Sequence, residues 1–216
     1  MRASIETGNM RWNAVLLVGP TGSGKTPLGQ LLEDGGLWGR RCLHFDFGEA
    51  LRVSAGRRTG PLTIGEREVV ETSLKSGRLL EDEHFSIAEK LLVDYLTCRR
   101  ASQDTMIVLN GLPRHVGQAK GIERIVGVQT LVSLECGPEV VWERIRTNAG
   151  GDRSGRGDET LEAVSRRLET FRMRTALLLE HYRCLEVPVL SLEVGAKSTA
   201  QELRRQLDAR WPVRPR

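Results

Sequence analysis

A short apolar run followed by a glycine-rich loop constrains this chain more than any other feature of its sequence. Residues 14–18 are entirely apolar, as expected of a buried strand, and residues 19–26 read GPTGSGKT. The loop matches the pattern G-x-x-x-x-G-K-[ST], whose glycines let the backbone approach a phosphate and aim N–H groups at it. Leucines at helical spacing follow, so a helix N-terminus adds to the anion site. Strand, loop and helix in this order predict a nucleoside triphosphate site.

The loop side chains suit ATP and Mg²⁺. Lys25 can reach the β and γ phosphates, and the Thr26 hydroxyl can ligate Mg²⁺. The backbone of the loop is expected to hold the remaining phosphate oxygens through Gly19, Gly22, Ser23 and Gly24. The alternative, a glycine-rich turn that binds nothing, is disfavoured because an apolar strand precedes the loop and a helix follows it.

Length, charge and cysteine usage exclude several other classes of protein. The 216 residues suit one domain, and no apolar run approaches the ~20 residues of a membrane-spanning helix. With no apolar signal segment at the N-terminus, we expect a cytoplasmic protein. The net charge of +4 is spread along the chain, so no nucleic-acid partner is expected. The cysteines contain no C-x-x-C pair, which favours reduced thiols over a zinc site or disulfides.

Short apolar runs alternate with helical patterns along the whole chain. This alternation predicts a parallel sheet with helices on both faces, and a ligand site beyond the carboxyl ends of its strands. The expected strands are 14–18, 42–45, 106–109, 130–134 and 189–194. The expected helices are about 25–33, 46–52, 64–76, 82–96, 118–125 and 138–147, a long one from 158 and a last one from 198.

Several further motifs, in order, resemble those of adenylate kinase and the related nucleoside monophosphate kinases. The resemblance runs from the phosphate loop to about residue 194. FGEALR (47–52) is similar to the family motif T-G-D-x-L-R, and SGRLLEDE (76–83) is similar to G-x-L-V-P-D-E. NGLPR (110–114) with Gln118 is similar to D-G-F-P-R-x-x-x-Q, and ERI (143–145) is similar to a run with a base-stacking arginine. GRGDE (155–159) is similar to G-R-x-D-D, and RLETF (167–171) is similar to R-L-E-T-Y.

The resemblance implies an α/β fold of the phosphate-loop nucleoside triphosphate hydrolase type, with a five-stranded parallel sheet flanked by helices. The whole chain, 1–216, would form a single kinase domain with its core at about 13–45, 83–146 and 158–212. A small helical insertion, about 46–82, would bind the nucleoside monophosphate. A short lid without cysteine pairs, about 147–157, would help to exclude water from the site.

The resemblance also assigns roles to individual residues. Lys25, Arg114, Arg156 and Arg167 would be catalytic, and Arg144 and Arg156 would join the phosphate loop in binding ATP. Arg144, taken alone, would instead be a solvated surface residue. The monophosphate would be bound by Phe47, Gly48, Arg52, Leu80, Gly111, Arg114, Gln118 and Arg167. Mg²⁺ would be held, partly through water, by Thr26, Glu49 and Asn110.

Four positions depart from the family pattern. One is Asn148, which stands where many relatives place a second lid arginine. Phe47 replaces a small hydroxyl residue that lines the acceptor-base pocket, so that pocket is expected to be reshaped. Glu49 and Asn110 both stand where the family has aspartate, and Asn110 loses the charge that orients Mg²⁺-bound water. We therefore expect Mg²⁺ to be held more weakly. The four histidines match no family role and are expected to be structural or to lie at the surface.

The expected function is Mg²⁺-dependent transfer of the ATP γ-phosphate to a nucleoside monophosphate, with AMP as the first candidate. Only small-molecule partners, no membrane and a monomeric state are expected. The departures at Phe47 and Asn110 leave open a nucleotide-binding sensor or regulatory protein with a decayed active site. A phosphate-loop kinase for a non-nucleotide acceptor is a third possibility, since motifs of this kind are shared among many activities.

Overall fold

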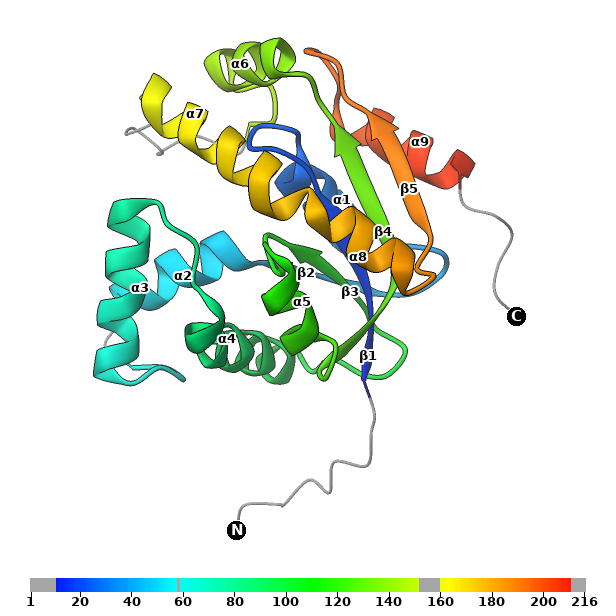
Figure 1. Cartoon of the computed structure of the whole chain (residues 1–216). Coiled ribbons are helices and arrows are strands. Elements are labelled where there is room, and N and C mark those ends of the chain that lie inside the picture. The colour runs from blue at the N-terminus through cyan, green and yellow to red at the C-terminus, as the bar shows by residue number, and fades with distance from the viewer. Residues whose placement is uncertain (1–10, 58, 152–159, 211–216) are drawn as a thin grey trace.

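A five-stranded parallel sheet forms the centre of the molecule (Figure 1). The computed structural model describes residues 11–57, 59–151 and 160–210. The strand order is β2-β3-β1-β4-β5, and every neighbouring pair is parallel. The strands are β1 (Trp12–Val18), β2 (Cys42–Asp46), β3 (Met106–Asn110), β4 (Val126–Glu135) and β5 (Val189–Glu193). The α/β fold and the parallel sheet predicted from the sequence are confirmed.

Alternate residues of β1 belong to two different hydrophobic cores. Ala14, Leu16 and Val18 pack into the core beneath α4 (Phe85–Cys98), α5 (Val116–Ile122) and α8 (Leu177–Cys184). Val15 and Leu17 pack into the core beneath α1 (Lys25–Gly35) and α9 (Ala200–Arg210). Helices therefore cover both faces of the sheet, as Figure 1 shows. Burial on both faces explains why the sequence of this strand is continuously apolar rather than alternating.

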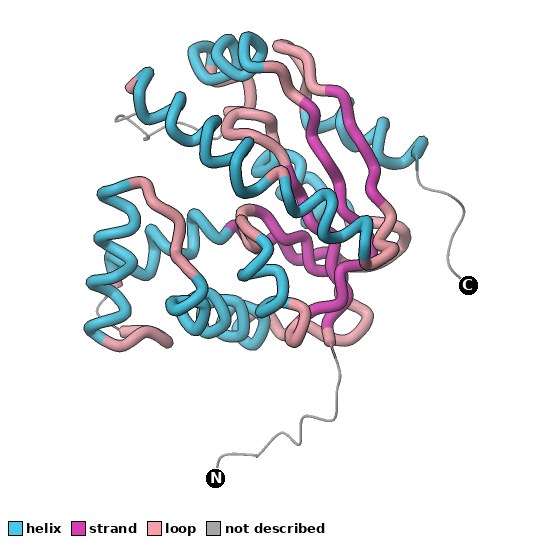
Figure 2. The backbone as a smooth tube through the Cα atoms, in the orientation of Figure 1, coloured by secondary structure: helices cyan, strands magenta, loops and turns pink. Residues whose placement is uncertain are grey.

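The helices account for most of the remaining described chain (Figure 2). They are α1 (Lys25–Gly35), α2 (Phe47–Gly56), α3 (Ile64–Ser76), a 3₁₀ turn η1 (Asp82–His84), α4 (Phe85–Cys98), α5 (Val116–Ile122), α6 (Pro138–Thr147), α7 (Leu161–Thr170), a π-helical turn η2 (Phe171–Thr175), α8 (Leu177–Cys184) and α9 (Ala200–Arg210). Two predicted helices, 64–76 and 138–147, have the predicted bounds. A capping box between Thr63 and Glu66 begins α3, and Gly77 ends it in a left-handed conformation.

Two of the elements that differ from the sequence prediction have a clear physical cause. Strand β4 begins at Val126 rather than Thr130, because β1 itself begins at Trp12 and supplies backbone partners for the extra residues. The predicted long helix is interrupted by η2, where the Ala176 N–H donates to the Phe171 carbonyl oxygen at 2.8 Å. This wider turn carries Arg174 and Thr175, which hydrogen-bond to Glu81 and to the Arg114 carbonyl.

Helices α2 and α3 pack on each other to one side of the sheet, and α7 lies across from them (Figure 1). Asp46, the last residue of β2, is also the N-cap of α2, so the chain passes from the sheet into these helices without a loop. Among the described residues no helix has the length and apolar character needed to cross a membrane. All four cysteines are free in this structure.

Candidate active site

The phosphate loop joins β1 to α1 in a conformation that depends on glycine. Gly22 and Gly24 have φ angles of 78° and 99°, which residues with a side chain rarely adopt. A Cβ atom on Gly22 would also lie 2.9 Å from Cγ1 of Ile145. The Lys25 ammonium donates to the carbonyl oxygens of Gly19 and Pro20 at 2.7 and 2.8 Å. The loop thus curls around the lysine.

A cavity of about 380 Å³ opens beside this loop, beyond the carboxyl ends of β1, β2 and β3. The loop forms one wall, and α2, the end of α3, and the α7–η2 segment form the others. Of the predicted site residues, the cavity is lined by Gly19, Gly22, Gly24, Lys25, Thr26, Gly48, Arg52, Gly111, Arg114, Asn110 and Arg167. Ser23, by contrast, is fully buried.

Four of the predicted cations, each from a separate element, line this cavity. Lys25 comes from α1, Arg52 from α2, Arg114 from the loop after β3 and Arg167 from α7. Arg114 is held in place by its Nε, which donates to the Gly111 carbonyl oxygen at 3.0 Å. The fifth predicted cation, Arg156, lies outside the described residues. Converging cations of this kind suit a ligand with several phosphates.

Polar side chains from α1, β2 and β3 meet at the floor of the cavity. The Thr26 hydroxyl donates to Oδ2 of Asp46 at 2.8 Å. The Asn110 amide donates to the same Oδ2 at 2.8 Å and to the Thr26 oxygen at 3.0 Å. Burial disfavours the ionised form of Asp46, but hydrogen bonds from the Glu49 N–H and from Thr26, together with the charge of Arg52, hold its pKa below the usual value. Asp46 is therefore ionised at neutral pH.

The side chains on this floor fit Mg²⁺, which prefers oxygen ligands and retains several waters. Thr26, Asp46 and Asn110 all carry oxygen atoms and lie at the phosphate loop. Glu49, which the family resemblance assigns to the metal, is 61% exposed and pairs instead with Arg52 at 2.8 Å. The described residues contain no cluster of three or more His, Cys, Asp or Glu side chains suited to a metal. A bound Mg²⁺ would therefore need the phosphates of a nucleotide as further ligands.

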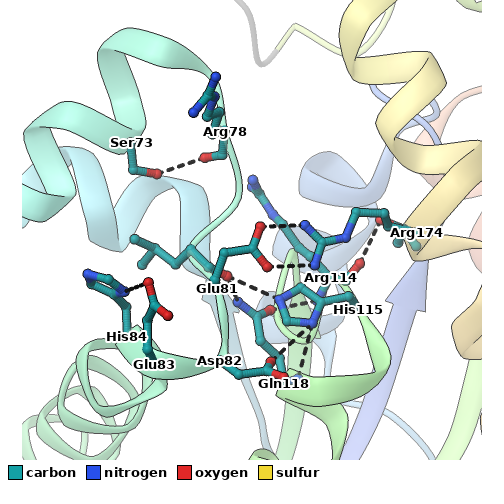
Figure 3. A network of polar contacts seen from close by, with 12 residues as sticks. Ser73, Arg78, Glu81, Asp82, Glu83, His84, Arg114, His115, Gln118 and Arg174 are labelled. Carbon is teal, nitrogen blue, oxygen red and sulfur yellow. Dashed lines mark hydrogen bonds and ion pairs between the residues drawn. The ribbon is translucent and has the colours of Figure 1, made fainter.

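On the side that the family resemblance assigns to the acceptor, the cavity differs from the family pattern at Gln118 (Figure 3). This side chain is fully buried, and it is not among the residues that line the cavity. Its Oε1 accepts from the Arg114 N–H at 2.8 Å, and its Nε2 donates to the Leu80 carbonyl oxygen at 2.9 Å. His115 also contacts that carbonyl, at 3.1 Å. In this conformation Gln118 is bonded to the Leu80 backbone. Leu79, rather than the predicted Leu80, lines the cavity.

Phe47 does not reshape the cavity, contrary to the sequence-based expectation. Its ring is 1% exposed and belongs to the core beneath α4 and α5. The ring centroid lies 6.2 Å from that of Phe45. Because Phe47 is the first residue of α2, its side chain anchors that helix to the sheet. The residue therefore stabilises the fold, and it does not line the cavity.

Arg144 lies inside the protein, so the expectation of a solvated surface residue is wrong. It is 2% exposed. Its Nε donates to the Gly22 carbonyl oxygen at 2.9 Å, and its Nη1 donates to the carbonyl oxygens of Gly195 and Ser198 at 2.9 and 2.8 Å. These bonds join the phosphate loop to the segment between β5 and α9. With so little of it exposed, Arg144 offers no open face on which a base could stack in this conformation.

Curated relatives carry names that agree with this site. The chain is 30% identical over 203 residues to an adenylate kinase of Synechococcus sp. (strain WH7803), covering 90% of this chain and 96% of that one. The chain belongs to the adenylate kinase family. A uridylate kinase of Saccharomyces cerevisiae is 24% identical over 172 residues, covering 79% of this chain and 78% of that one. The relatives named here thus carry the names of kinases for different nucleotides.

The fold is also found in a solved structure with another name. A gluconokinase from Sinorhizobium meliloti 1021 aligns with a TM-score of 0.51 at 20% identity, covering 92% of this chain and 91% of that one. This likeness concerns the fold alone. No protein-family model matches the chain.

Asp46 is one of the cavity residues that the sequence motifs do not include. The motif FGEALR begins one residue later, at Phe47, and Asp46 was expected only as the first residue of a helix at about 46–52. A signal was present, because Asp46 directly follows a buried strand whose carboxyl end should meet the phosphate loop. What the sequence did not show is that this residue pairs in register with Asn110 of β3.

The buried ring of Phe47 leads to a test of its role. Phe47→Thr, which restores a small hydroxyl residue, should lower the free energy of unfolding by ~3–5 kcal/mol, because it leaves a cavity in the core. Urea unfolding of the variant and the wild type would measure this. Arg57→Thr, an exposed change at the end of the same helix, is the control. A loss below ~1 kcal/mol for Phe47→Thr would contradict the core assignment.

The buried contacts of Arg144 lead to a second test. Arg144→Met keeps most of the side-chain volume but leaves carbonyl oxygens of the phosphate loop and the β5–α9 segment without donors. Each such charge-assisted bond contributes ~1.5–3 kcal/mol, so the variant should unfold at clearly lower urea concentration and bind ATP more weakly. Arg146→Met, exposed on the same helix, is the matched control. Equal stability of the two variants would show that Arg144 does not anchor the loop.

Proposed function

We propose that this protein is a nucleoside monophosphate kinase that transfers the γ-phosphate of ATP to a monophosphate, with Mg²⁺ as cofactor. The observation that carries this proposal is the single cavity that the phosphate loop shares with Arg52, Arg114 and Arg167. Phosphoryl transfer depends mainly on positioning and on neutralising charge, rather than on covalent chemistry by the protein. A cavity with cations on opposite walls is suited to two anionic substrates that meet end to end.

The donor end of the cavity is the phosphate loop. The backbone of Gly19, Gly22 and Gly24 would hold the ATP phosphates, and the N-terminus of α1 adds a favourable field. The Lys25 ammonium, which contacts loop carbonyl oxygens in this structure, would turn to the β and γ phosphates. Arg167 lines the cavity from the opposite side and would stabilise the charge on the phosphoryl group in transit. Arg156 is proposed to assist from the lid on the sequence resemblance alone.

The acceptor end is formed by α2, the end of α3 and the loop after β3. We propose that residues 46–82 are the monophosphate-binding insertion of this domain. Arg52 and Arg114 would bind the acceptor phosphate, and Gly48 and Gly111 line the same region. Arg52 already pairs with a carboxylate, Glu49, with its guanidinium partly exposed. An incoming phosphate can therefore replace or share this partner without displacing buried groups.

The acceptor base is inferred from the relatives and from the residues that line the cavity. AMP is the first candidate, because several of the relatives are named adenylate kinase. Gln118 is the residue that the resemblance assigns to reading adenine, yet both ends of its amide are bonded within the protein. Base recognition would then fall to the cavity residues Ser73, Arg78 and Leu79, unless binding releases Gln118.

A coupled assay for ADP tests the function directly. The protein is given ATP and Mg²⁺ with AMP, UMP, CMP or GMP in turn, and ATP alone is the blank. ADP formed only in the presence of a monophosphate supports the proposal, and the rates rank the bases. Small hydroxylated metabolites form a second panel. Transfer to that panel alone would instead indicate a kinase for a non-nucleotide acceptor, and ATP binding without any transfer would indicate a decayed site.

Lys25→Ala should lower the rate of phosphoryl transfer at least ~10²-fold, because it removes a fixed charge aimed at charge that develops in the transition state. The fold should survive, since the side chain reaches into the loop rather than into a hydrophobic core. Circular dichroism and urea unfolding check the fold, and the coupled assay measures the rate. A folded Lys25→Ala protein with near-normal activity would remove the phosphate loop from the mechanism.

Arg52→Ala and Arg114→Ala should weaken binding of the monophosphate more than binding of ATP. Each variant loses charge-assisted bonds to one phosphate, which contribute ~1.5–3 kcal/mol apiece. Separate calorimetric titrations with the two nucleotides measure the difference. Arg57→Ala, an exposed change at the end of α2, is the matched control. Equal losses for both nucleotides would place these arginines on the wrong side of the cavity.

A further inference from the structure

Asp46 and Asn110 occupy equivalent places on neighbouring strands. They are the last residues of β2 and β3, and they pair directly in the parallel register. Both line the cavity, beside Thr26 of the phosphate loop. The family resemblance places a metal-orienting carboxylate at residue 110, where this chain has an amide. The carboxylate of Asp46 lies one strand away, at a position that the family motifs do not include.

The chemistry of the contacts fixes which way the Asn110 amide points. An ionised carboxylate only accepts hydrogen bonds, so the group 2.8 Å from Oδ2 of Asp46 must be the NH₂ of Asn110 rather than its carbonyl oxygen. The same NH₂ lies 3.0 Å from the Thr26 oxygen and 3.5 Å from Nε2 of His44. Asn110 therefore supports Asp46 as a donor.

The Thr26 hydroxyl is also oriented by Asp46. It donates its only proton to Oδ2 at 2.8 Å and accepts from the Asn110 NH₂ at 3.0 Å, which leaves one oxygen lone pair for a further partner. A hydroxyl held in this way is prepared to act as a metal ligand, because its proton is already bonded to Asp46. The negative charge of Asp46 at the same point favours a cation further.

The two oxygens of Asp46 have separate tasks. Oδ1 accepts from the Glu49 N–H at 3.0 Å and so caps α2. Oδ2 makes no contribution to that cap and instead accepts from Thr26 and Asn110. Helix capping alone would not require a carboxylate, since asparagine or serine caps a helix as well.

We propose that Asp46 is the positioning residue that supplies the negative charge of the Mg²⁺ site, in place of the carboxylate missing at residue 110. Asp46 would orient the Thr26 hydroxyl and accept from Mg²⁺-bound water, with Asn110 as its support. This inference rests on the ATP and Mg²⁺ part of the proposed function. It does not depend on which acceptor receives the phosphate.

Reciprocal exchange of the two residues tests the inference. Affinity for ATP is measured by calorimetry over a series of Mg²⁺ concentrations, without any acceptor, and Mn²⁺ binding is followed by electron paramagnetic resonance. The variants are Asp46→Asn, the double variant Asp46→Asn/Asn110→Asp, and Asp94→Asn, which removes an exposed carboxylate from α4 as the matched control. Asp46→Ser replaces Asp46→Asn if the latter fails to fold.

Asp46→Asn should raise the Mg²⁺ concentration for half-maximal ATP binding about tenfold, because bonds to a neutral acceptor are roughly half as strong. Affinity for ATP without metal should change less than about twofold, since the cap is kept. The double variant should return to within about threefold of the wild type, because a carboxylate again faces Thr26. A merely structural role of Asp46 would not produce this rescue. The Asp94→Asn control should match the wild type.

Two results would overturn the inference. One is an unchanged Mg²⁺ dependence in Asp46→Asn, and the other is a double variant that is as impaired as the single one. Failure of the proposed function has a different signature, namely wild-type protein that binds Mg²⁺ and ATP but transfers phosphate to no monophosphate.

Discussion

Burial of the central strand on both faces is the constraint on which the rest of the structure depends. Because Leu16 and Leu17 point into different cores, helices must cover both sides of the sheet, and the connections between parallel strands must be helical crossovers. Every strand then ends at the same edge. The phosphate loop, Asp46 and the Asn110–Arg114 turn meet there although they are up to 95 residues apart in the sequence.

The positions of the charged side chains at this edge follow from what each must bind. Arginines and a lysine line the walls, where a phosphate can reach them, and they come from helices and loops. The carboxylate of Asp46 lies on the floor, bonded to the hydroxyl and the amide that flank it. A carboxylate among cations on the same surface would neutralise them. At the base of the phosphate loop it instead favours a metal ion, which the nucleotide would share.

Packing decides which polar residues can take part in binding. Gln118 and Arg144 both match family positions that touch a base, yet here both are buried and bonded to the backbone. The N–H donors of an amide or a guanidinium inside a protein need hydrogen-bond acceptors, and nearby backbone carbonyl oxygens supply them. These residues therefore hold the walls of the site together. Loop motion on binding would have to break those bonds before either residue could contact a nucleotide.

The sequence by itself determined the α/β class, the parallel sheet, the phosphate loop and the arginines that the cavity gathers. Local patterns were sufficient there, because apolar runs, glycine positions and motif spacing act over a few residues. Only the tertiary structure decided that Phe47 packs into the core and that Arg144 is buried. It also revealed Asp46, whose partners Thr26 and Asn110 lie 20 and 64 residues away. Burial and pairing of this kind depend on the register of neighbouring strands, which no local pattern records.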